Sequence, residues 1–376
     1  MRTLFLLLCL FPICLAAQTM SFEEYEPKSS LVVPEHLVTR AKFPFIDVHN
    51  HQFNMPTQDL QQVVADMNKL NMAVMVNLSG RGFRQIQHAD GSTSFGHQDS
   101  AFLTAALDNA NKNAPGRFII FTNVEFNGFG EVGWTEKAVA ELERDIKAGA
   151  QGLKIYKQLG LDVLDTSGKR VPVDDPRLDP IWAKCGELGV PVLIHSADPA
   201  QFWLPHDKYN ERWLELKQRP ERYRYPRRAS LSWEQVMEEH FNIMRKHPET
   251  TFISAHMAWM ANDLARLGKI LDDIPNMYTE IGAIIYEPGR QPRFANKWFT
   301  KYQDRILFGK DIWAPEEYYV YFRVLETADE YFDYYRKRHA FWKMYGLALS
   351  DNVLKKLYYK NALKIIPGID ASRFPE

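Results

Sequence analysis

Two histidines one residue apart close an apolar run near the start of the chain. The run is FPFIDVHNHQF, and the histidines are His49 and His51. Side chains two residues apart on a strand point to the same side, so both imidazoles can reach one point. That arrangement suits a metal ion, although a strand end whose histidines meet water would show the same spacing. The pair predicts a metal site only if other segments supply further ligands.

Two more histidines and a carboxylate also stand at the ends of apolar runs. They are His195, His256 and Asp311. Imidazole and carboxylate groups are ligands that suit Zn²⁺ or a similar divalent ion. An ion with an open position lowers the pKa of bound water, and a nearby carboxylate can hold or accept its proton. Taken singly, each histidine could be a buried group satisfied by a carbonyl, and Asp311 could cap a helix. Their shared position favours a metal centre.

These residues need a fold that gathers strand ends at one edge. Eight short apolar, β-branched runs alternate with amphipathic segments such as 57–70, 135–149 and 233–247. Such alternation is typical of a parallel sheet, and eight units match an α/β fold of the (β/α)₈ TIM-barrel type, whose sites lie at the carboxyl ends of the strands. A doubly wound open sheet is the alternative, but no GxGxxG loop follows any run. The expected strands are 43–49, 73–79, 117–124, 151–157, 190–196, 250–256, 276–283 and 304–311.

The barrel is expected to form one domain over residues 43–376, preceded by an N-terminal segment, 18–42. Two insertions interrupt it. Segment 197–230, after strand five, is rich in proline, arginine and aromatic residues, which indicates a structured loop over one rim. Segment 316–346, after strand eight, carries aromatic residues near one helical face, which favours packing in the core or of a helix on the barrel; a ligand platform is the alternative.

The first 17 residues have the layout of a secretory signal peptide, with one early positive charge, an apolar stretch and small residues at Ala16 and Ala17. An uncleaved anchor is the alternative. Cys9 and Cys14 lie in this segment, so the mature chain would keep only Cys185 and no internal disulfide. We expect a periplasmic or secreted protein that is free of the membrane after cleavage. The formal net charge of −1, with no long run of one sign, argues against a nucleic-acid partner.

Other polar side chains are candidates for binding substrate. Lys154 and Tyr156 lie on the fourth expected strand. Arg81 and Arg84 follow the second and could bind an anionic group through two hydrogen bonds, although solvated loop arginines would look the same. Carboxylates near the ends of strands three and seven are expected to hydrogen-bond the ligand histidines. They are Glu125 and Glu280.

The pattern of HxH, His, His and Asp at strand ends resembles the amidohydrolase superfamily, and most closely the amidohydrolase-related branch that includes aminocarboxymuconate-semialdehyde decarboxylase. The similarity runs from about residue 43 to residue 366. Its motifs are DVHNH (47–51), GLKIY (152–156), PVLIHSAD (191–198), TFISAHMA (251–258) and ILFGKD (306–311). The motif GKD departs from the commoner Gly-Thr/Ser-Asp, because Lys310 precedes the aspartate.

The resemblance implies a ligand set and a metal. The metal ligands would be His49, His51, His195 and Asp311, and the ion would be divalent, with zinc expected and one ion favoured over two. His256 would activate water, bind substrate or hold a second ion. In two-metal members a strand-four lysine is carboxylated and bridges the ions. In the single-metal branch such a lysine holds a substrate carboxylate, which is the role we expect for Lys154.

The resemblance and the residues together predict an exported, metal-dependent hydrolase of an amide, ester or lactone. Metal-activated water would attack, and Asp311 and His256 would handle protons. Non-oxidative decarboxylation of an unsaturated or aromatic acid is the alternative, because one ligand set supports both reactions. A barrel that binds a ligand without turnover is the third hypothesis. The expected partner is a small anionic or aromatic molecule, and the insertion at 201–230 would suit it or a contact in a homo-oligomer.

Overall fold

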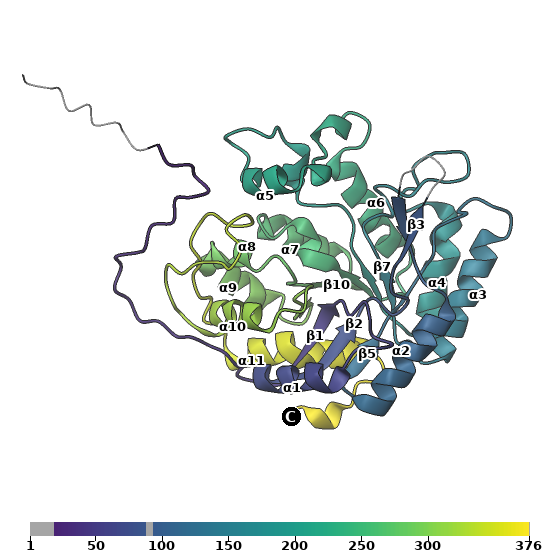
Figure 1. The fold of residues 1–376 in the computed structure, drawn as a ribbon, viewed down its shortest axis with the longest axis horizontal. Coiled ribbons are helices and arrows are strands. Elements are labelled where there is room, and N and C mark those ends of the chain that lie inside the picture. Colours follow the sequence, from purple (N-terminus) through teal and green to yellow (C-terminus); the bar gives the residue numbers. More distant parts are fainter. Residues whose placement is uncertain (1–18, 88–92, 376) are drawn as a thin grey trace, which may run out of the picture. The chain divides into compact units, whose positions relative to one another are not determined.

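The computed structural model describes residues 19–87 and 93–375 (Figure 1). The expected cleavage site near Ala17, with Cys9 and Cys14, lies outside these residues. The chain divides into two units, Met1–Val32 and Val33–Glu376. In the first, the described residues include a turn in which the Glu24 N–H donates to the Ser21 carbonyl at 3.2 Å. In the part of the chain that the structure describes, no helix has the length and apolar character needed to cross a membrane.

Parallel strands form the centre of the second unit. Two sheets have the orders β1-β2-β5 and β11-β10-β9-β8-β7-β6. Strands β5 and β6 are one run interrupted at Phe121, whose N–H donates to the Asn77 carbonyl at 2.9 Å. The described residues therefore give eight successive parallel strands. Their bounds are β1 Phe45–Asn50, β2 Met72–Asn77, β5 Phe118–Ile120, β6 Thr122–Asn123, β7 Leu153–Ile155, β8 Val192–Ile194, β9 Phe252–Ser254, β10 Met277–Glu280 and β11 Ile306–Leu307.

The first and last strands join and close the sheet. The Val48 N–H donates to the Phe308 carbonyl at 2.9 Å, and the Asp311 N–H donates to the His49 carbonyl at 2.6 Å. Asn50 and Asp311 form a parallel bridge. The predicted (β/α)₈ barrel is confirmed, and each expected run overlaps its strand, although β1 extends one residue beyond its run to Asn50 and β2 begins one residue before its run at Met72. The runs read as continuously apolar because their residues are buried on both faces of the sheet.

Amphipathic helices surround the barrel (Figure 1). In α1, Val63, Met67 and Leu70 are buried on one face, and the Asp59 side chain caps the first turn by accepting from two backbone N–H groups. The bounds are α1 Leu60–Leu70, α2 Ser100–Asn113, α3 Trp134–Lys147, α4 Asp179–Glu187, α6 Trp233–Lys246, α7 Leu264–Asp273, α8 Tyr286–Gly289, α9 Pro292–Lys301, α11 Asp351–Lys355 and α12 Asn361–Ile365, with a π-helical turn at Lys356–Lys360.

The insertions only partly match their predictions. The segment after strand five is structured, with α5 (Trp213–Gln218) and short 3₁₀ turns. An antiparallel hairpin of β3 (Arg84–Gln87) and β4 (Thr93–Gly96) follows strand two and was not predicted. In segment 316–346, α10 covers only Tyr318–Glu326, so the aromatic residues from Tyr331 onward do not share a helical face, although Tyr334 among them is buried in the core as the packing interpretation expects.

The chain leaves α10 because side chains there bond to the backbone. The Thr327 hydroxyl donates to the Arg323 carbonyl at 2.8 Å and accepts from the Asp329 N–H at 3.1 Å. Such bonds compete with helix continuation. The residues beyond form an irregular segment, joined by a bridge between Phe332 and Met344.

Candidate metal centre

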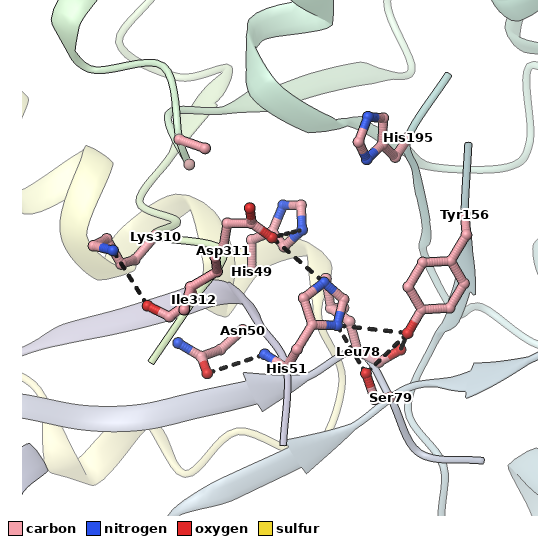
Figure 2. A network of polar contacts seen from close by, with 12 residues as sticks. His49, Asn50, His51, Leu78, Ser79, Tyr156, His195, Lys310, Asp311 and Ile312 are labelled. Carbon is pink, nitrogen blue, oxygen red and sulfur yellow. Dashed lines mark hydrogen bonds and ion pairs between the residues drawn. The ribbon is translucent and has the colours of Figure 1, made fainter. Parts of the chain in front are cut away.

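Donor atoms from the first and last strands meet at the mouth of the barrel. The Asp311 Oδ1 atom lies 3.4 Å from His49 Nε2 and 3.5 Å from His51 Nε2. Figure 2 shows the Asp311 carboxylate reaching between the two imidazoles. The ligand atoms of all three residues lie within 4.8 Å of one another. The structure therefore brings these three predicted ligands together.

Asp47 fixes the two chain segments that carry these donors. Side chains alternate along β1, so Asp47, His49 and His51 share one side. The Asp47 carboxylate accepts from the N–H groups of His49 at 3.0 Å and Lys310 at 3.1 Å, and from the Tyr318 hydroxyl at 2.6 Å. Burial raises the pKa of Asp47 to about 7. Sequence reasoning gave Asp47 no role, although its spacing of two from His49 was a usable signal.

Glu280 orients His49, as predicted for a partner of a ligand histidine. Its carboxylate accepts from His49 Nδ1 at 2.9 Å, from the His256 N–H at 2.6 Å and from the Gly282 N–H. With the proton held on Nδ1, the Nε2 atom of His49 presents a lone pair toward Asp311. That Nε2 atom is buried and has no hydrogen-bond partner among the described residues. A Cβ on Gly309 would lie 2.3 Å from Glu280 Oε2, so glycine is needed for this close approach.

A chain of hydroxyl groups orients His51. Its Nδ1 lies 2.8 Å from Ser79 Oγ, which lies 2.9 Å from the Tyr156 hydroxyl. Tyr156 donates to the Leu78 carbonyl at 3.1 Å. Because that carbonyl can only accept, the chain is satisfied when His51 Nδ1 donates to Ser79 and Ser79 donates to Tyr156. His51 Nε2 then carries the lone pair. Burial lowers the pKa of His51 to about 4, which keeps the ring neutral.

His195 and His256 form the opposite wall. His256 Nδ1 donates to the Gly282 carbonyl at 2.7 Å, and its Nε2 lies 3.3 Å from His195 Nδ1. The His256 ring also stacks on His49 with centroids 4.9 Å apart. The Nε2 atom of His195 is buried and lacks a described partner, and burial lowers the pKa of His195 well below its usual value. The structure thus places His195 in contact with His256 rather than directly against Asp311.

A left-handed turn carries His256. Residues His256, Met257, Ala258 and Trp259 have φ values between 52° and 56°. This conformation costs about 1–2 kcal/mol for each residue that has a Cβ, and such strain is concentrated at functional sites. The turn packs the Trp259 ring 4.6 Å from the His256 ring and 5.6 Å from the His195 ring. Asp311 is also left-handed, with φ 84°.

The donor set fits a divalent cation. His49 Nε2 and His195 Nε2 are buried polar atoms that have no hydrogen-bond partner among the residues the structure describes. A metal ion would satisfy such atoms. Burial alone would raise the pKa of Asp311, but the interaction with His49 and the other imidazoles outweighs it and lowers that pKa to about 2. Neutral imidazoles beside an ionised carboxylate are the forms that bind a metal.

Lys154 is buried beside this donor set. Its Nζ atom has no hydrogen-bond partner among the described residues and lies 5.3 Å from the centre of the Tyr156 ring. Burial lowers the pKa of Lys154 to about 7, even though Asp311 and Glu280 act to raise it. A buried ammonium group without a partner is costly, and an anionic ligand would relieve that cost. Its predicted role in holding substrate stays a prediction.

Three residues proposed from sequence lie away from the donor atoms. Arg81 is buried, and its guanidinium bonds Glu141 at 3.2 Å and the Gln98 carbonyl at 2.9 Å. Glu125 accepts from the His97 N–H at 2.8 Å and pairs with Arg84 at 3.8 Å, so its described bonds are not to a ligand histidine. Arg81, Arg84 and Glu125 instead line a separate cavity of about 280 Å³.

An aromatic wall beside His51 consists of Phe53, Phe83, His97 and Tyr156. Sequence reasoning proposed Tyr156 as a substrate-binding residue but missed the other three. The Phe53 ring is parallel to the His51 ring, with centroids 5.4 Å apart, and lies 5.3 Å from Phe83. Phe83 and His97 pack on Tyr156 at 4.9 Å and 5.5 Å. Phe53 is 45% exposed. The aromatic residue two positions after His51 was the available signal.

His240 was also missed, and it supports the opposite wall. It lies on α6 and bridges Ser196 Oγ at 2.9 Å and Ser254 Oγ at 2.7 Å. Ser196 follows His195, and Ser254 ends β9. Burial lowers the pKa of His240 to about 3, so a neutral ring links the ends of the fifth and sixth barrel strands, β8 and β9.

The fold and the donor set define a metal-dependent enzyme of the (β/α)₈ class. The chain belongs to the amidohydrolase family, whose family model matches residues 46–367. No curated protein matches the chain.

Solved structures with the same fold include a dihydroxybenzoic acid decarboxylase from Polaromonas sp. JS666, with bound manganese and the inhibitor 2-nitroresorcinol. It is 14% identical, the match covers 88% of this chain and 99% of that chain, and the TM-score is 0.51. An uncharacterised TIM-barrel protein from Bordetella bronchiseptica is 15% identical, with 85% and 97% covered and a TM-score of 0.50. At these identities the similarity shows the fold alone.

Proposed function

We propose that the protein is a metal-dependent hydrolase of an amide, ester or lactone bond. His49, His51, His195 and Asp311 would hold the divalent ion, for which zinc is expected. The observation that carries this proposal is the position of Asp311. Its side chain contacts both imidazoles yet is 27% exposed, whereas Glu280 is fully buried. Asp311 is therefore a carboxylate that water and substrate can reach.

In this proposal, different residues of the chain carry out different steps of hydrolysis. A bound divalent ion would polarise the scissile carbonyl group and lower the pKa of water. Asp311 accepts a proton as the water oxygen bonds to the carbonyl carbon, and that proton passes to the leaving nitrogen or oxygen as its bond to carbon breaks. His256 presents Nε2 because Gly282 holds its Nδ1–H, so it can bind or relay that proton. Lys154 would hold an anionic group of the substrate.

Hydrolysis in H₂¹⁸O tests this proposal. Purified zinc-loaded protein is offered a panel of lactones, esters, anilides and aromatic acids, and the products are weighed by mass spectrometry. We expect one ¹⁸O atom in the new carboxylate at each turnover. Asp311→Asn should lower the rate by about 10²–10⁴-fold, as expected for loss of a general base. Release of CO₂ without uptake of ¹⁸O would overturn the hydrolase assignment.

A second candidate is decarboxylation of an aromatic acid. The aromatic wall and the unpartnered Lys154 ammonium support it, because together they offer a stacking surface and a carboxylate partner. In D₂O this reaction would release CO₂ and place one deuteron on the ring carbon. Phe53→Ala should then raise KM for ring-bearing acids while leaving KM for aliphatic esters unchanged. Equal effects on both would remove the support that the wall gives to this candidate.

The number of ions is tested separately. We propose one ion, with Lys154 binding substrate. Metal analysis of the parent and of Lys154→Met should then give one equivalent in both, with weaker substrate binding in the variant. Loss of one of two equivalents would support a carboxylated lysine that bridges two ions.

We also propose that the protein is exported, with cleavage near Ala17. The charged start, apolar stretch and small residues of 1–17 support this. Mass analysis of the full-length product after cell fractionation should find the processed chain outside the cytoplasm. An intact N-terminus in the cytoplasm would contradict export, and an intact one in the membrane would indicate an anchor.

A further inference from the structure

Lys310, which precedes the metal-binding carboxylate, is buried in an aromatic cage. Its side chain is 1% exposed. The Nζ atom lies 5.7 Å from the centre of the Tyr318 ring, 5.8 Å from that of Tyr321 and 5.3 Å from that of Tyr335. The faces of three tyrosine rings attract a cation, and Tyr335 belongs to the irregular segment after strand eight. The lysine is thus enclosed by the barrel end, α10 and that segment.

Within the cage, the ammonium makes two polar contacts. Nζ donates to Glu317 Oε2 at 2.5 Å and to the Ile312 carbonyl at 3.2 Å. Glu317 also accepts from Arg336 Nη2 at 2.9 Å and 3.0 Å. Figure 2 shows the bond from Lys310 to Ile312, which immediately follows Asp311. Lys310 therefore connects the end of the last strand, β11, to the ion pair between Glu317, which precedes α10, and Arg336. Arg336 lies on the irregular segment after α10, called the covering segment below.

These contacts hold Asp311 from both sides. On its N-terminal side, the Lys310 N–H donates to Asp47, and the Asp311 N–H donates to the His49 carbonyl. On its C-terminal side, the Ile312 carbonyl is held by the Lys310 ammonium. Asp311 has a left-handed backbone, which an aspartate keeps only when its surroundings fix it. Without the ammonium, this restraint on the C-terminal side of Asp311 is lost.

We propose that Lys310 is a positioning residue that fixes Asp311 for cation binding and couples this ligand to the covering segment through Glu317 and Arg336. The inference rests on the cation site of the proposed function. A purely structural lysine would stabilise the fold without affecting the ion, so the two roles can be separated. Partners that orient a metal ligand are worth about 10–100-fold in metal affinity.

Lys310→Met tests the proposal on the full mature chain. The variant is expected to fold, because Glu317 keeps its two bonds to Arg336 and methionine suits an aromatic cage. The zinc dissociation constant is measured by competition with a chelator, and the visible absorption spectrum is recorded for the cobalt-loaded protein. We expect about 10–100-fold weaker zinc binding and an altered cobalt spectrum. Glu317→Gln should change both readouts in the same direction, by less.

Lys343→Met is the matched control, because Lys343 pairs with Asp333 on the same segment and is far more exposed than Lys310. It should leave zinc affinity and the cobalt spectrum unchanged. If folded Lys310→Met matches the parent in both readouts, the positioning role is wrong. If Lys310→Met does not fold, folded Glu317→Gln with parental readouts refutes the coupling. A parent that binds neither zinc nor cobalt would instead overturn the cation site of the proposed function.

Discussion

Replacing Glu280 with glutamine should weaken metal binding although none of the proposed metal ligands is changed. The carboxylate accepts three hydrogen bonds, from His49 Nδ1, the His256 N–H and the Gly282 N–H. Glutamine keeps one acceptor oxygen but places an NH₂ group against one of these donors. A lost bond to a charged group costs about 1.5–3 kcal/mol, and the unsatisfied donors add about 1–3 kcal/mol. We expect the free energy of unfolding to fall by about 3 kcal/mol.

The same change should lower zinc affinity by about 10–100-fold, because Glu280 fixes the proton on His49 Nδ1 and so presents its Nε2. By the relation between affinity and free energy, this loss is about 1.4–2.7 kcal/mol. Chelator competition measures the affinity, and circular dichroism confirms that the variant is folded. Glu234→Gln is the control, since this exposed carboxylate pairs with Arg266. A folded Glu280→Gln protein with parental zinc affinity would show that Glu280 does not prepare His49 for metal binding.

Three further outcomes are expected. Gly309→Ala should weaken zinc binding and lower stability by about 1–3 kcal/mol, because its Cβ would lie 2.9 Å from the His49 Cβ; parental values would show that the neighbours can move aside. Ala258→Gly should raise stability by about 1 kcal/mol in thermal unfolding, since glycine relieves a left-handed residue; a lower Tm would contradict this. For Lys154, the folded pKa of about 7 lies below the usual 10.5, so the unfolded chain binds more protons between these values. The metal-free protein should therefore gain stability as pH rises from 7 toward 10, and Lys154→Met should lack this gain in Tm against pH.

The barrel could be predicted because its strands are short apolar runs at regular intervals, and burial on both faces leaves that pattern in the sequence. The same regularity placed His49, His51 and Asp311 at strand ends, where the fold brings them together. Glu280 was predicted for the same reason, since it ends β10, which pairs with the last strand, β11. The positions of these residues follow from the order of the strands alone. The spacing of the apolar runs along the chain was therefore sufficient to predict them.

Other features depend on contacts between distant segments. The aromatic pattern after the last strand suggested a helix. Tyr334 and Tyr335 instead pack against the core from an irregular segment of chain. Arg81 resembled a loop arginine, but it is buried, and its guanidinium contacts Glu141 on α3 and the Gln98 carbonyl, which lie far from it in sequence. Lys310 was noticed as a departure from the family motif, yet the three rings around it come from residues that sequence alone could not bring together. Local patterns do not encode such neighbours.

Because the barrel closes between its first and last strands, the proposed metal site can form only after the last strand has been synthesised. His49 and Asp311 stand near opposite ends of the barrel sequence, and the Asp311 N–H reaches the His49 carbonyl only when strand eight docks beside strand one. A chain still being synthesised would lack Asp311 until its final part emerged, so a growing chain could not hold an ion with this donor set. Metal loading would thus be a late event that reports completion of the whole barrel, and a C-terminally truncated chain should reveal itself by failing to retain zinc.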